Sequence, residues 1–274
     1  MARQSLQSSR FEYKYYVDEK TAKNIQEFIH PCYVEEDEFL KRFPGIGYPV
    51  CSLYLDNSGL LLYGDTIQGA KNRFKLRIRF YDDNQENPAF LEIKRRETDV
   101  IKKKRAAVTR EGARQILLGE KPRDSFLFGK VNSKTLDAMH EFCDLRDRIG
   151  AQGCTYVYYH RQAYVSPHGS HCRVTFDRQL EGGVYVPGEK LTIPTESRQP
   201  KLAGVVLELK FTDRKPNWMV ELSDVFGLQR TSVPKYVMCV EALDIHKKGL
   251  PELSEMHFMS RTGAKDINKD ERLD

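Results

Sequence analysis

The sequence predicts an α+β fold built around a large antiparallel sheet. Seven stretches alternate apolar and charged residues at the period of two that is typical of a half-buried β-strand. Several of these stretches are joined by connections short enough for hairpins, and amphipathic helical segments lie between them. Each predicted strand has one apolar face, so we expect helices to pack over the apolar side of the sheet.

Composition indicates one globular domain. Of the 274 residues, 40% are hydrophobic and 30% are charged, and no linker rich in Pro, Ser and Gly divides the chain. No apolar run approaches the roughly 20 residues of a membrane-spanning helix, and residues 1–10 lack the apolar core of a secretory signal. The six cysteines form no C-x-x-C pair, which disfavours zinc and disulfides. We therefore expect a cytoplasmic protein with free thiols.

The first strand and helix are predicted from a capping signal. Residues 11–17 alternate at strand period, and Asp18 is the expected N-cap because apolar residues at helical spacing follow it. A short strand is expected at 51–56. The segment 59–69 is expected to be irregular or to form a single turn.

Three charged strands follow at 74–81, 90–97 and 101–109, with the turn 82–88 between the first two. Thr109 is the expected cap of a helix that Gly119 ends. The remaining predicted elements are a helix at 133–149, a hairpin at 155–165 and 171–177, a strand at 205–211, a helix containing Trp218, and a last helix after Ser232 that has Pro234 in its first turn and runs through Leu243.

The polar faces of these strands carry far more basic than acidic residues, although the whole chain has a formal charge of only +5. A densely anionic ligand, such as polyphosphate or a nucleoside triphosphate, would stabilise such a concentration of positive charge. The basic residues are Lys14, Lys75, Arg77, Arg79, Lys94, Arg96, Lys103, Arg105, Arg161, Arg173 and Lys210, and the acidic ones are Glu12, Glu92, Asp177 and Glu208.

Periodicity leaves two arrangements open. In an open sheet with one solvated face, lysines and glutamates would form ordinary surface pairs in nearly equal numbers. In a sheet closed on itself, the charged faces would line a polar tunnel while helices cover the apolar outside. The period of two is the same in both arrangements.

Six short segments occur in the order seen in VTC-type domains, and the chain therefore resembles that family of the triphosphate tunnel metalloenzyme (CYTH-like) superfamily. The segments are EYKY (12–15), KLRIR (75–79), EIKRR (92–96), RQAY (161–164), RVT (173–175) and ELK (208–210). The resemblance covers roughly residues 10–243 and implies a single domain, with flexible termini at 1–9 and 252–274. It implies a closed antiparallel β-barrel with a basic interior and helices packed outside.

The best characterised VTC-type domains are polyphosphate polymerases. The resemblance thus implies transfer of the γ-phosphate of ATP to the end of an inorganic polyphosphate chain, with release of ADP. Fixed guanidinium and ammonium groups would stabilise the charge on the transferred oxygens, and no Ser/His/Asp arrangement is needed. VTC-type domains often work beside membrane proteins, so a membrane protein partner and a peripheral position at a membrane are compatible with the resemblance.

Carried over residue by residue, the resemblance assigns roles to the basic face. The expected catalytic residues are Arg77, Arg79, Lys94, Arg161 and Arg173, and the expected phosphate-binding residues are Lys14, Lys103, Arg105, Tyr159, Lys210 and Lys235. Around Lys103 several registers are open, and strand parity favours Lys103 together with Arg105.

Glu208 stands in the family's metal-binding position. A carboxylate is the hard oxygen ligand that Mn²⁺ or Mg²⁺ prefers, and the ion would bridge phosphate oxygens. The alternative is an ion pair between Glu208 and a basic residue of the tunnel. Glu12 and Glu92 are weaker candidates that would mainly orient Lys and Arg side chains.

One segment departs from the family pattern. The polymerases commonly have Lys-aromatic-Ser-Lys at the start of the last helix, whereas this chain has Lys235-Tyr236-Val237-Met238. Losing one lysine removes a charged contact worth about 1.5–3 kcal/mol, which would lower affinity or rate by one to two decades.

Three other functions stay open. Other members of the superfamily hydrolyse tripolyphosphate or nucleoside triphosphates, and they typically have a Glu-x-Glu pair near the first strand. This chain has Glu12-Tyr13-Lys14 there, which disfavours hydrolysis. The departure at Val237 and Met238 keeps a non-catalytic polyphosphate or inositol-phosphate sensor possible. Nucleic-acid binding is disfavoured, because the isoelectric point is only modestly basic.

Overall fold

The computed structural model describes residues 10–43, 45–98, 100–167, 172–202 and 204–250. One ten-stranded sheet dominates this part of the chain, and every ladder in it is antiparallel. Its main path runs β1-β10-β8-β7-β3-β4-β5-β6, with β2 on β7 and β9 on β8. The α+β prediction with a large antiparallel sheet is confirmed.

The strands are β1 (Arg10–Val17), β2 (Glu35–Glu36), β3 (Tyr48–Asp56), β4 (Asn72–Phe80), β5 (Ala89–Glu97), β6 (Val100–Val108), β7 (Gln152–Val165), β8 (Cys172–Val184), β9 (Ser197–Arg198) and β10 (Val205–Thr212). The helices are α1 (Glu19–Ile29), η1 (Leu40–Arg42), α2 (Leu61–Ile67), α3 (Arg110–Leu117), η2 (Asp124–Phe126), α4 (Ser133–Ile149), α5 (Asn217–Val225), α6 (Lys235–Ala242) and α7 (Ile245–Lys248).

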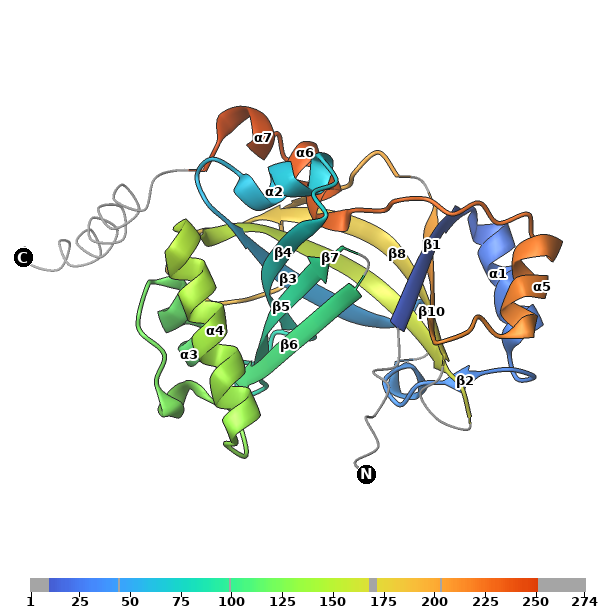
Figure 1. Cartoon of the computed structure of the whole chain (residues 1–274), viewed down its shortest axis with the longest axis horizontal. Helices are drawn as coiled ribbons and strands as arrows, with labels where there is room; N and C mark the ends of the chain where they lie inside the picture. Colours follow the sequence, from blue (N-terminus) through green and yellow to red (C-terminus); the bar gives the residue numbers. More distant parts are fainter. Residues whose placement is uncertain (1–9, 44, 99, 168–171, 203, 251–274) are drawn as a thin grey trace, which may run out of the picture.

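Helices cover the apolar outer face of the sheet at both ends of the strand order (Figure 1). Helices α1 and α5 pack on β1, β10 and β8, where Ile25 and Leu222 are fully buried. Helices α3 and α4 pack on β3 to β6, where Phe142 is fully buried. The apolar face therefore forms two cores, and the charged faces of the strands point to the opposite, inner side.

Helix α6 lies on the inner face, which the sequence did not predict. It packs on β7 and β8, and its Tyr236 and Cys239 share a core cluster with inner-face residues of β3 and β7. Gly182 of β8 permits this approach, because a Cβ there would lie 2.9 Å from the Cβ of Cys239. One part of the inner space is thus filled by a helix.

The sheet curves until its two ends approach each other (Figure 1). Among the described strands, no backbone pairing joins β1 to β6, so the closed barrel that the family resemblance implied is not closed by hydrogen bonds. Side chains bring the ends together instead: Lys94 Nζ of β5 lies 3.2 Å from Glu12 Oε2 of β1. The inner face is consequently a curved, charged wall with an ion pair across its opening.

Most predicted elements are present, and two segments need correction. Residues 59–69 contain the seven-residue helix α2 rather than an irregular or single-turn connection, because the Asp56 carboxylate accepts the amides of Leu62 and Tyr63 at 2.9 Å each. The strand predicted to end at 177 continues to Val184, paired with β7 and β9. Helix α4 has the predicted bounds, and Asp18 and Thr109 cap α1 and α3 as predicted.

No helix in the described ranges is both long enough and apolar enough to cross a bilayer. The predictions of flexible termini at 1–9 and 252–274 lie outside the described residues.

Candidate functional site

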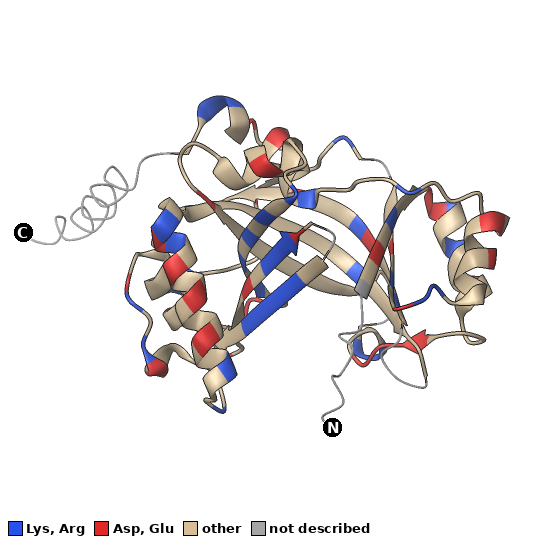
Figure 2. Cartoon of the chain, viewed as in Figure 1, with Lys and Arg blue, Asp and Glu red and all other residues tan. Residues whose placement is uncertain are grey.

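The inner face collects the basic residues that the sequence singled out. Figure 2 shows Lys and Arg following β4, β5 and β6 on the curved part of the sheet. Alternation along each strand directs every second side chain inward, and the apolar neighbours of those side chains pack under the outer helices. The electrostatics of this face depend on how its carboxylates are distributed among the cations.

Four residues form what we call the rim cluster: Arg77, Glu92, Lys103 and Arg105. Glu92 is 1% exposed and lies 2.7 Å from Arg77 Nη2, 2.6 Å from Lys103 Nζ and 3.3 Å from Arg105 Nε. Burial alone would raise the pKa of Glu92, but Arg77, Arg79 and Lys103 hold it well below its usual value. One ionised carboxylate thus faces three cations, and the Lys103 and Arg105 side chains are 45% and 39% exposed.

The arginines of β4 are oriented by hydroxyl groups on neighbouring strands. Arg77 Nη1 donates to Tyr54 Oη at 2.9 Å, and Arg79 Nε donates to Ser52 Oγ at 3.0 Å. Arg79 Nη2 also lies 3.4 Å from Tyr159 Oη of β7. These contacts fix the guanidinium planes on the inner face.

Four other residues form what we call the inner cluster: Arg161, Asp177, Glu208 and Lys235. Arg161 makes a bidentate pair with Asp177 at 2.6 and 2.7 Å, and Lys235 Nζ contacts Asp177 and lies 3.0 Å from Glu208 Oε1. All four are buried or nearly so. Burial opposes the charge of Lys235, but Asp177 and Glu208 raise its pKa. The cluster contains two cations and two carboxylates, so its charges balance.

The opening between the ends of the sheet is bridged by Glu12. This carboxylate lies 3.3 Å from Lys14 and 3.2 Å from Lys94. Burial and Glu208 act to raise the pKa of Glu12, yet Lys210, Lys94 and Lys14 lower it to about 2. Lys14 and Lys210 also approach Glu208, at 3.5 and 2.8 Å. Glu208 therefore accepts from several basic residues, which is the ion-pair alternative foreseen from sequence.

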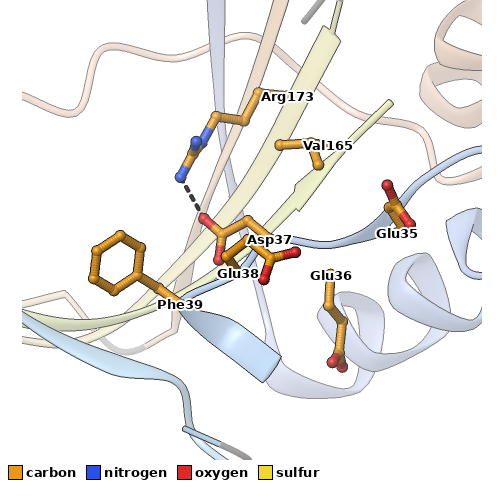
Figure 3. Close-up of a pocket in the computed structure, with 7 residues that line it drawn as sticks. All are labelled: Glu35, Glu36, Asp37, Glu38, Phe39, Val165 and Arg173. Carbon is orange, nitrogen blue, oxygen red and sulfur yellow. Dashed lines mark hydrogen bonds and ion pairs between the residues drawn. The ribbon is translucent and has the colours of Figure 1, made fainter. Parts of the chain in front are cut away.

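Arg173 lies beside an acidic connection (Figure 3). Its Nη2 lies 2.6 Å from Asp37 Oδ2 and 3.3 Å from Tyr48 Oη. Asp37 comes from the segment between β2 and η1, where its other oxygen accepts the amide of Leu40 at 2.9 Å. Arg173 is 40% exposed and lines a pocket with Glu35, Glu36, Glu38, Phe39 and Val165.

The structure shows which side chains of β6 around Lys103 point to the inner face. Lys103 and Arg105 contact Glu92 on the inner face, whereas Lys102 and Lys104 contact Glu97 and Glu141 on the other side. Lys75 is inside too, 5.9 Å above the Tyr236 ring.

Sequence reasoning missed Ser52, Tyr54 and Asp37. The parity of β3 was available as a signal, since Ser52 and Tyr54 alternate with Cys51, Leu53 and Leu55, which are buried under the outer helices. Asp37 carried no such signal, because it belongs to a connection. Val237, at the departure from the family pattern, is 2% exposed and presents no hydroxyl.

Comparison with known proteins supports one family. A search of curated proteins finds no match. A crystal structure of a "putative adenylate cyclase" from Bacillus halodurans is similar with a TM-score of 0.45 and 13% identity, over 82% of this chain and 93% of that one. At this TM-score and identity, the similarity does not indicate a shared function. A family model described as VTC domain matches residues 9–244, which is most of the chain. On that match, the chain belongs to the VTC domain family.

Proposed function

We propose that the inner face binds the triphosphate of ATP and passes its γ-phosphate to the end of an inorganic polyphosphate chain. The observation that carries this proposal is the rim cluster, in which three cations share one carboxylate at a partly exposed position. A bound phosphate oxygen would neutralise the surplus charge through charge-assisted hydrogen bonds. Membership of the VTC domain family supports the same ligand class.

The proposed roles follow the sequence-based assignment. Arg77, Arg79 and Lys94, together with Arg161 and Arg173, would stabilise the charge of the transferred phosphoryl group. Lys14, Lys103, Arg105, Tyr159, Lys210 and Lys235 would hold the flanking phosphates. The reaction needs positioned cations more than a protein nucleophile, so an array fixed by carboxylates and hydroxyls suits it.

Glu208 is the residue proposed to hold a divalent cation, Mn²⁺ or Mg²⁺. Its carboxylate is ionised, because the charges of Lys210, Lys235, Lys14 and Arg161 outweigh burial and lower its pKa well below the usual value. Within the described ranges, no three His, Cys, Asp or Glu side chains gather to hold a metal on their own. An ion held by Glu208 would therefore need phosphate oxygens as its other ligands and would displace some of the lysines that now contact this carboxylate. Such an ion would neutralise charge on the phosphates.

Incubation of the purified protein with ATP, Mn²⁺ and a short polyphosphate primer, followed by separation of products by length, tests the reaction. Longer chains together with ADP would support polymerase activity. Shortened chains, or ATP consumed without chain growth, would indicate a hydrolase.

A binding-only function is the second candidate, and the buried Val237 of α6 favours it. A sensor would bind inorganic tripolyphosphate and yield neither longer nor shorter chains. The two candidates share the same inner face, so only product analysis separates them.

The replacement Arg77→Ala tests the ligand class under both candidates. We expect tripolyphosphate affinity, measured by titration calorimetry, to fall at least about 100-fold, because Arg77 supplies a fixed charged contact. The fold should persist by circular dichroism, since Lys103 and Arg105 still pair with Glu92. Unchanged affinity in a folded variant would contradict the assignment.

A further inference from the structure

Two hydroxyl groups of β3 face the arginines of β4 across the ladder. Ser52 is the register partner of Arg79, and Tyr54 is the partner of Arg77. Each hydroxyl oxygen accepts a hydrogen bond from its arginine. A guanidinium has no acceptor atom, so neither hydroxyl can donate its own proton back to that arginine.

Of the two hydroxyls, that of Tyr54 is the one that contacts the rim cluster, because its oxygen accepts from Arg77. Its oxygen is 2.9 Å from Arg77 Nη1, and no acceptor for its proton occurs among the described residues. The side chain is 92% buried, being 8% exposed. A buried donor without an acceptor is costly, so the position favours a ligand that supplies one.

The groups that β4 and α6 place around Tyr54 are donors or have their acceptors already occupied, which favours an anionic partner. From β4, Lys75, Arg77 and Arg79 are all donors. From α6, the Tyr236 ring stacks on Tyr54 with centroids 4.9 Å apart, but the Tyr236 hydroxyl donates to Asp56 at 2.7 Å.

The remaining neighbours lead to the same conclusion. The Asp56 carboxylate also accepts the backbone amides of Asn57, Leu62 and Tyr63, so its oxygens are occupied. Glu92 is held by the cations of the rim cluster. The β7 register partner of Tyr54 is Thr155, whose Oγ1 donates to the Gly183 carbonyl at 2.9 Å, and the preceding residue, Cys154, belongs to the apolar cluster around α6. Burial alone would raise the pKa of Tyr54, but Arg77, Lys75 and Arg79 lower it to about 8.

We propose that the Tyr54 hydroxyl donates a hydrogen bond to a phosphate oxygen of the anion that Arg77 binds. Tyr54 is then a substrate-contacting residue for tripolyphosphate, nucleoside triphosphate and polyphosphate alike. Ser52 is fully buried beside Arg79 and acts as a positioning residue for that guanidinium. This inference rests on the proposed function, since it requires a phosphate ligand on the inner face.

The variant Tyr54→Phe removes only the hydroxyl and keeps the ring that stacks on Tyr236. At pH 6.5 we expect the Kd for inorganic tripolyphosphate, from titration calorimetry, to rise roughly 10- to 100-fold, the range of one hydrogen bond to a charged group. The matched control is Tyr63→Phe on α2, whose hydroxyl donates to Glu241 at 3.2 Å in an exposed position and contacts no basic residue of the rim cluster. That control should bind as the wild type does.

A pH series separates donation to the ligand from a structural role. As pH rises through about 8, the wild-type phenol loses the proton that it donates, so its advantage over Tyr54→Phe should disappear. Lysines that are not coupled to Tyr54 affect both proteins alike, but the pKa of Lys75 depends on Tyr54, so the comparison is made with Lys75→Arg present in both proteins. A hydroxyl that only positions Arg77 would give a small ratio at pH 6.5, and its phenolate would repel the bound anion at higher pH, so the affinity at pH 6.5 is the primary readout.

Equal affinity of Tyr54→Phe and wild type at pH 6.5, or a ratio that does not change up to pH 9.5, overturns the inference. If one of these two results is obtained but Arg77→Ala still abolishes binding, the role of Tyr54 fails and the proposed function stands. If wild-type protein binds no tripolyphosphate at any pH, the proposed function itself fails.

Discussion

The inner cluster and the rim cluster use the same residue types to opposite effect. In the inner cluster, two cations meet two carboxylates in a nearly solvent-free position. In the rim cluster, three cations meet one carboxylate, and two of those cations are more than a third exposed. A buried charge must be balanced by its neighbours, whereas a partly hydrated one tolerates a surplus that a ligand can neutralise. We therefore expect the inner cluster, besides its proposed phosphate contacts, to contribute most to stability and the rim cluster to contribute most to anion affinity.

The largest effect is expected for Asp177→Asn. The change leaves the Arg161 and Lys235 charges buried with only Glu208 to balance them, so the free energy of unfolding should fall by about 3–5 kcal/mol. Urea unfolding measures this loss. The control Glu19→Gln, which breaks the pair with Arg178 at an exposed carboxylate, should change it by less than about 1 kcal/mol. An equally small loss for Asp177→Asn would remove the distinction between the clusters.

An intermediate effect is expected for Lys103→Ala. Tripolyphosphate affinity should fall roughly tenfold, because one cation of the surplus is lost, while the unfolding free energy changes by less than about 1 kcal/mol. The adjacent Lys102→Ala is the matched control, since Lys102 pairs with Glu97 on the other side of β6. Should Lys102→Ala weaken binding as much as Lys103→Ala does, general surface charge would explain the affinity.

The smallest effect is a pH dependence of the wild-type protein. Burial lowers the pKa values of Lys75 and Lys103 to about 8, although Tyr54 and Glu92 act in the opposite sense. Both lysines are charged below that pH and neutral above it, so tripolyphosphate affinity should fall several-fold between pH 7 and pH 9. Calorimetric titrations across this range measure the change.

The same lysines should have the opposite effect on stability. Their folded-state pKa values lie below the ordinary value of 10.5, so between about pH 8 and 10.5 the unfolded chain binds more protons than the folded one. Their contribution to the unfolding free energy therefore rises with pH in this window. The double variant carrying Lys75→Arg and Lys103→Arg should lose the stability trend, since arginine stays charged, and should keep only the part of the affinity decrease that comes from Tyr54. An affinity decrease as large as that of the wild type would show that the two lysines do not contribute to it.

Sequence reasoning located the strands and the basic faces because both depend on local period. The alternation of Lys75, Arg77 and Arg79 with apolar residues already fixed which side chains share a face. Capping side chains such as Asp18 and Thr109 were equally readable, since their partners lie three residues away. Helix α2 could not be predicted in this way, because Asp56, whose carboxylate accepts hydrogen bonds from the first amides of the helix, lies outside the usual cap position.

What the sequence determined by itself is therefore an antiparallel sheet with one apolar and one strongly basic face, because side-chain direction along a strand follows from chain geometry alone. Only the tertiary structure decided which carboxylate meets which cation. Glu92 forms ion pairs with basic residues of β4 and β6, and Glu208 forms them with basic residues of β1, β7 and α6. Asp37 pairs with Arg173 from a connection that is distant in sequence. Pairing across strands depends on sheet curvature and on where α6 packs, and these arise from long-range burial that no local pattern encodes.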